Sequence, residues 1–94
     1  NPVVILPGAV KERGSKIAEE LAASGLAAVG QMCTSPGLVF LIDSPEAQTL
    51  VDDCVNRYEQ AQPGTLLSDQ VRQSLSRGVD TLKNAGATVP TRVK

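Results

Sequence analysis

Two short stretches of the chain are continuously apolar, and each predicts a buried β-strand. The first covers residues 3–6, Val-Val-Ile-Leu, and the second covers residues 38–42, Leu-Val-Phe-Leu-Ile. Short runs of aliphatic and β-branched residues bounded by turn residues are typical of strands. Because neither run alternates with polar residues, both predict parallel strands that are covered on both faces.

Residues 10–28, between the two strands, predict a helix. Its apolar residues recur at helical spacing and its charged residues occupy the other side. The apolar positions are Ile17, Ala18, Leu21 and Ala22, and the charged positions include Glu12, Glu19 and Glu20. We expect Gly25 and Gly30 to loosen the end of this helix.

A second helix is predicted from Ser44 to about Tyr58, before the turn Gln62-Pro63-Gly64. Ser44 is suited to cap its first turn, and Pro45 and Glu46 suit the positions that follow. The apolar residues of this segment form one stripe at helical spacing. They are Ala47, Leu50, Val51, Cys54, Val55 and Tyr58.

A third helix is predicted to begin near Ser68 and to end before Gly86. One of its faces is apolar and consists of Val71, Leu75, Val79 and Leu82. The element order β-α-β-α-α places the chain in the α/β class, as one βαβ unit plus two further helices. Such a unit normally lies inside a larger sheet. Residues 87–94 are expected to form a loose tail.

Composition narrows the classes of function. The 94 residues suffice for one small domain, and aromatic residues make up only 2%, so the core must be aliphatic. The net charge is −1, and the basic residues are scattered along the chain, which argues against a nucleic-acid partner. No apolar run reaches the length of a membrane span, so no membrane partner is expected.

The cysteine count argues against a metal site and for a reducing compartment. Two cysteines without any histidine cannot supply four zinc ligands, so no metal is expected. Nothing in the sequence suggests disulfide formation, and we expect a reduced, cytoplasmic protein. Because the sequence opens with Asn1 and carries no leader signal, we also expect it to begin partway through a longer chain.

Cys33 is the first candidate for chemistry, in the run Gly30-Gln31-Met32-Cys33-Thr34 before the second strand. An ordinary thiol is only about 3% ionised at neutral pH, so a reactive one needs a base or a positive field. The absence of histidine excludes a Cys–His pair, and spacing alone favours an inert, buried cysteine. Cys54 lies on the apolar stripe of the second helix and is predicted to be a small core residue.

The glycines do not form a phosphate-binding loop, since Gly25, Gly30 and Gly37 match no nucleotide-binding spacing. Without a Cys-x-x-Cys pair, a thiol-redox domain is a weak alternative.

Four segments together resemble the aldehyde dehydrogenase superfamily. Gly30-Gln31-Met32-Cys33 is similar to the Gly-Gln-x-Cys run around that family's nucleophile, and residues 1–9 resemble the strand after its catalytic glutamate. Residues 33–40 and the run Pro63-Gly64-Thr65-Leu66-Leu67 look like the branch of 2,5-dioxovalerate (α-ketoglutarate semialdehyde) dehydrogenases. The resemblance covers residues 1–86, which would form part of the three-layer αβα catalytic domain.

The resemblance implies a function and a set of site residues. Cys33 would attack an aldehyde, hydride would leave to NADP or NAD, and water would release a carboxylate. The backbone N–H of Cys33 would bind the oxyanion, and Gly30, Gln31 and Thr34 would support the site. The catalytic glutamate, the second oxyanion donor and the nucleotide-binding domain would belong to absent segments.

The isolated chain is therefore expected to be inactive, and the parent is expected to be a homo-oligomer. The alternative is a non-catalytic α/β fragment or interaction module from a truncated gene.

Overall fold

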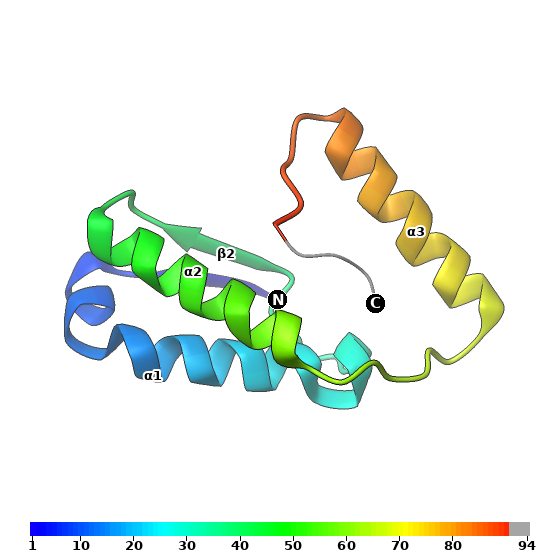
Figure 1. Ribbon diagram of the computed structural model, residues 1–94, viewed down its shortest axis with the longest axis horizontal. Helices are drawn as coiled ribbons and strands as arrows, with labels where there is room; N and C mark the ends of the chain where they lie inside the picture. Colours follow the sequence, from blue (N-terminus) through cyan, green and yellow to red (C-terminus); the bar gives the residue numbers. More distant parts are fainter. Residues whose placement is uncertain (91–94) are drawn as a thin grey trace.

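The computed structural model describes residues 1–90, and in that range it contains a two-stranded parallel sheet, three α-helices and one 3₁₀ turn (Figure 1). The elements in chain order are β1 (Pro2–Ile5), α1 (Pro7–Leu26), η1 (Ala27–Gly30), β2 (Leu38–Leu41), α2 (Pro45–Gln60) and α3 (Asp69–Asn84). The α/β class, with one βαβ unit plus two further helices, is confirmed. Residues 91–94 of the expected loose tail lie outside the described residues.

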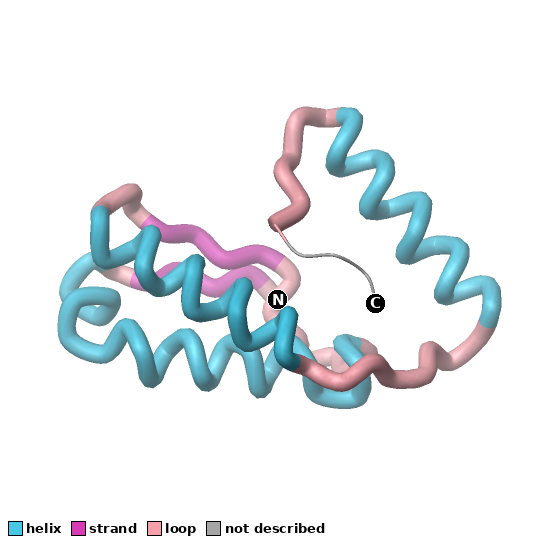
Figure 2. The backbone as a smooth tube through the Cα atoms, viewed as in Figure 1, coloured by secondary structure: helices cyan, strands magenta, loops and turns pink. Residues whose placement is uncertain are grey.

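Helix α1 connects the two parallel strands, which pair from Pro2 with Leu38 to Ile5 with Leu41 (Figure 2). The helix begins at Pro7, earlier than predicted, because proline is well suited to the first helical position. Gly25 is the last residue but one of α1, which ends at Leu26, and a side chain there would collide with the hydroxyl of Tyr58 on α2. The glycine thus lets the two helices approach closely.

The hydrophobic core lies between α1, α2 and one face of the sheet. Ala18 of α1 is completely buried, and Leu50 of α2 is 3% exposed. The buried cluster is Ile5, Val10, Ala18, Ala47 and Leu50, with Cys54 among the residues packed against it. The predicted stripes of α1 and α2 thus supply part of the core, through Ala18, Ala47 and Leu50. Val51 and Tyr58 of the predicted α2 stripe are instead exposed.

The opposite face of the sheet is open within residues 1–90, which corrects the prediction that both faces are covered. Val4 and Phe40 are neighbours across the strands and are 68% and 53% exposed. Helix α3 does not cover them, because it stands apart from the sheet, as Figure 1 shows. Continuous apolarity reports that both faces of a strand are apolar, but it does not report what covers them.

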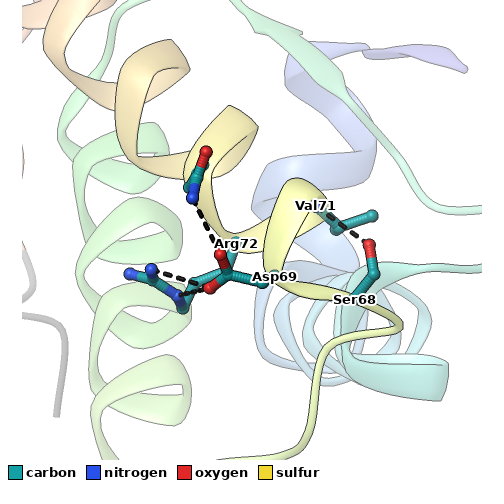
Figure 3. A network of polar contacts seen from close by, with 5 residues as sticks. Ser68, Asp69, Val71 and Arg72 are labelled. Atoms are coloured by element: carbon teal, nitrogen blue, oxygen red, sulfur yellow. Dashed lines mark hydrogen bonds and ion pairs between the residues drawn. The ribbon is translucent and has the colours of Figure 1, made fainter.

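Helix α3 is held by contacts within its own first turns (Figure 3). Ser68 Oγ accepts a hydrogen bond from the Val71 N–H at 3.2 Å, and Asp69 pairs with Arg72 at 2.8 Å. The apolar face predicted for this helix exists, but it is not packed: Leu75 and Leu82 are 55% and 62% exposed.

In the described part of the chain, no helix has the length and apolarity to cross a membrane.

Candidate functional site around Cys33

Cys33 lies exposed in the segment that leads into β2. The Ser35 N–H donates to the Met32 carbonyl at 3.1 Å, which closes a turn around Cys33. Asn1 Nδ2 donates to the Cys33 carbonyl at 2.6 Å, and the Gly37 N–H donates to the Asn1 carbonyl at 3.2 Å. Asn1, the residue before β1, is therefore hydrogen-bonded both to Cys33 and to Gly37, which follows the turn. The turn lies at the amino ends of the two parallel strands.

Three successive left-handed residues precede this turn. Ala28, Val29 and Gly30 have φ angles of 49°, 60° and 77°. Glycine adopts such angles without strain, whereas for a β-branched residue such as valine they are exceptional. Backbone strain of this kind costs about 1–3 kcal/mol per residue and persists only where surrounding contacts impose it. The site therefore begins with a strained turn that needs support from elsewhere in the fold.

Gln31 connects this turn to the linker between α2 and α3. Its Oε1 accepts from the Leu67 N–H at 2.8 Å, and its Nε2 donates to the carbonyls of Ala28 at 3.0 Å and Thr65 at 3.5 Å. The exposed side chain of Thr34, beside Cys33, lines a shallow pocket with Val3 and Leu21. Gly30, Gln31, Cys33 and Thr34 are already neighbours in the sequence, and the fold places residues 64–67 against this segment, a contact that sequence reasoning missed.

Cys54 occupies a different environment. It is half-buried on α2 and lines an apolar groove between that helix and β2. Burial raises the pKa of its thiol, and the Asp53 carboxylate raises the pKa further, while the Arg57 guanidinium opposes both effects. Burial also raises the pKa of Tyr58, with the neighbouring Cys54 adding to the effect. The raised pKa favours the neutral form of this thiol, which suits a residue packed against the core.

Few other groups near Cys33 could assist chemistry. Within residues 1–90, no side chain hydrogen-bonds to the Cys33 thiol, and Glu12, Glu19 and Glu20 are exposed on α1 as expected. Across the same residues, no three His, Cys, Asp or Glu side chains converge on a point. Among the described residues, the Cys33 thiol therefore has no base in hydrogen-bond contact.

The connection between β1 and α1 contains no dinucleotide-binding loop. Nucleotide-binding βαβ units have a glycine-rich loop between the first strand and the first helix. In this chain only Leu6 lies between β1 and α1. A pyrophosphate would therefore find no loop of N–H groups to bind it at this helix.

An exposed thiol on a strained turn, at the edge of a βαβ unit, defines an α/β segment with a candidate nucleophile. The chain matches no protein-family profile. It is 36% identical over 84 residues to an alpha-ketoglutaric semialdehyde dehydrogenase of Acinetobacter baylyi, covering 89% of this chain and 16% of that protein. It is 33% identical over 78 residues to alpha-ketoglutaric semialdehyde dehydrogenase 2 of Azospirillum brasilense, covering 83% of this chain and 15% of that protein.

These similarities confirm the resemblance to the aldehyde dehydrogenase superfamily: the chain is related in sequence to a short segment of such enzymes. It spans about one sixth of the length of the relatives it matches.

Proposed function

We propose that the chain is the nucleophile-bearing segment of an aldehyde dehydrogenase and that Cys33 is the nucleophile. The observation that carries the proposal is the exposed Cys33 on a turn whose backbone is held from two sides, by Asn1 and by Gln31. The similarity to two dehydrogenases supports the same reaction class. The alternative, a segment without chemistry, is not favoured by any contact in the described residues.

The proposed step at Cys33 is addition of its thiolate to an aldehyde. The sulfur forms a bond to the carbonyl carbon, the π electron pair moves to the oxygen, and protonation of that oxygen completes a thiohemiacetal. The backbone N–H of Cys33 would donate to the oxygen as negative charge develops on it. Oxidation of this adduct to a carboxylate requires a nicotinamide cofactor, NADP or NAD, and the described residues contain no glycine-rich loop after β1 to bind it.

The names of the relatives suggest the class of aldehyde. Both are called semialdehyde dehydrogenases of alpha-ketoglutaric acid, so we propose a semialdehyde with a carboxylate as the substrate of the parent enzyme. The parent is further proposed to be cytoplasmic and homo-oligomeric.

Adduct formation tests the proposal directly. The purified chain is mixed with an aldehyde labelled with ¹³C at its carbonyl carbon, and the thiohemiacetal is measured by NMR. We expect the adduct signal to disappear in Cys33→Ser and to persist in Cys54→Ser, with both variants folded by circular dichroism. Equal adduct in the two variants would contradict the assignment of Cys33.

The same mixtures test whether the chain suffices for oxidation. With NAD⁺ or NADP⁺ added, we expect no reduced nicotinamide, because the resemblance assigns the base, the second oxyanion donor and the cofactor domain to segments outside the described residues. Loss of one oxyanion donor alone lowers a rate by roughly 10²–10³. Reduction that Cys33→Ser abolishes would show that the chain is a complete catalyst.

A further inference from the structure

We propose that Gln31 is a positioning residue, which fixes the Cys33 turn by binding the backbone of the linker between α2 and α3. The inference rests on the proposed function of Cys33, and it adds residues 64–67 to the site. Its basis is a pair of contacts that join segments more than thirty positions apart in the sequence.

The first contact is the carboxamide of Gln31, which uses both its donor and its acceptor. The amide accepts from the Leu67 N–H at 2.8 Å and donates to the Thr65 carbonyl at 3.5 Å. A carbonyl at one residue and an N–H two residues later are the groups that a neighbouring strand would engage. The Gln31 side chain therefore binds the linker as a short strand partner would, and its Nε2 also holds the Ala28 carbonyl at 3.0 Å.

The second contact is independent of hydrogen bonding. Gly64 lies directly against the side chain of Val29, so closely that an added Cβ would collide with the valine methyl groups. Val29 is itself the strained residue of the left-handed turn, with a φ of 60°. The linker thus packs on the strained residue with its glycine and binds Gln31 with its backbone.

Together these contacts explain how the strained turn is maintained. Asn1 holds the Cys33 carbonyl from the strand side, and the linker holds Val29 and Gln31 from the other side. Cys33 is two residues from Gln31, so loss of the linker contact frees one of the two supports of the backbone that presents the thiol. Gln31 therefore acts through the position of Cys33 rather than through contact with the aldehyde.

The test compares Gln31→Met with Gln62→Met. Methionine keeps the length of the side chain without its polar atoms, and Gln62 is an exposed residue of the same linker with no hydrogen bond in the described part of the chain. The readouts are hydrogen exchange of the Leu67 amide and ¹⁵N relaxation of the Cys33 amide. Leu67 is 86% exposed, and its N–H donates to Gln31 Oε1, so this hydrogen bond is what should protect the amide from exchange.

We expect Gln31→Met to accelerate exchange at Leu67 roughly two- to tenfold, as loss of one ordinary hydrogen bond should, and Gln62→Met to leave it unchanged. We also expect the order parameter of the Cys33 amide to fall from the rigid value of about 0.85 in Gln31→Met alone. Unchanged exchange at Leu67 would overturn the contact. Faster exchange at Leu67 with an unchanged Cys33 amide would show that Gln31 serves only the linker.

A second variant keeps the test valid if Gln31→Met does not fold. Gly64→Ala leaves Gln31 intact but pushes the linker away from Val29. It should therefore lower the order parameter of the Cys33 amide, as Gln31→Met is expected to do. Gly14→Ala is its control, because an added Cβ there meets nothing within 4 Å. A rigid Cys33 in Gly64→Ala would count against the proposal. None of these readouts needs aldehyde addition, so failure of Cys33 as a nucleophile would be seen separately.

Discussion

The two cysteines of this chain differ in their surroundings. Cys33 and Cys54 carry the same thiol, yet one is exposed on a turn and the other is half-buried between α2 and the sheet. Burial raises the pKa of Cys54 because the thiolate loses hydration, and the Asp53 carboxylate repels it as well. The two thiols should therefore be chemically distinguishable in the folded chain.

We predict that iodoacetamide labels Cys33 before Cys54 near neutral pH. The thiolate is the reacting form, and a raised pKa lowers its fraction at any given pH, so labelling of Cys54 should shift to higher pH. Each unit of pKa shift changes that fraction about tenfold, and burial slows access further. Peptide mapping after brief labelling at several pH values measures both rates.

The unfolded chain is the control for this labelling experiment. In urea the two cysteines lose their different environments, and their labelling rates should become similar. Faster labelling of Cys54 than of Cys33 in the folded chain would contradict the exposure of the proposed nucleophile.

Helices α2 and α3 begin alike but differ in what holds them. Ser44 accepts a hydrogen bond from the Ala47 N–H at 3.0 Å, and Ser68 accepts one from the Val71 N–H at 3.2 Å. Helix α2 buries Ala47 and Leu50 in the core, whereas α3 buries none of its described residues. The Ser44 cap should therefore contribute to the stability of the folded core, whereas the Ser68 cap should affect only the local order of α3.

We predict that Ser44→Ala lowers the free energy of unfolding of the core by about 1 kcal/mol, the usual cost of losing such a cap. Ser68→Ala is the matched control, and it should shift the same transition much less while accelerating amide exchange at the start of α3. Urea unfolding followed by circular dichroism measures the first effect. Equal shifts from both variants would mean that α3 unfolds together with the core.

At the scale of the whole molecule, the described residues leave an apolar surface exposed to water. Val4, Leu38 and Phe40 are each more than half exposed on the open face of the sheet, and Leu6 and Ile42 follow at its end. At about 25 cal/mol per Å², several hundred Å² of uncovered apolar surface forfeit on the order of 10 kcal/mol. That is comparable to the stability of a small domain, so we expect this face to be buried by association with another molecule.

We predict that the chain self-associates through the open sheet face, and that Phe40→Lys weakens the association. Gln48→Lys is the matched control, since it adds the same charge at an exposed position of α2. Light scattering coupled to size exclusion, over a wide concentration range, measures the mass. A folded monomer at all concentrations, without binding of a hydrophobic dye, would show that the open face is stable in water.

Local signals were enough to predict most elements. The apolar runs before Pro7 and before Asp43 correspond to β1 and β2, and Ser44 with Pro45 marks the start of α2. These features depend on residues within one or two turns of each other, where backbone sterics and capping act. The run around Cys33 also carried the resemblance to aldehyde dehydrogenases, because it is contiguous in the sequence.

The amino-acid sequence by itself thus determined the strands, the helices, the α/β class and the candidate nucleophile. Only the tertiary structure decided that Gln31 binds Leu67, 36 positions later, that Gly25 admits Tyr58, and that α3 stands apart from the open sheet face. Hydrophobic periodicity indicates which face of an element is apolar. Which other element packs against that face depends on the path of the chain and on contacts between distant residues. For this reason the thiol was visible in the sequence, while the contacts that hold its turn were not.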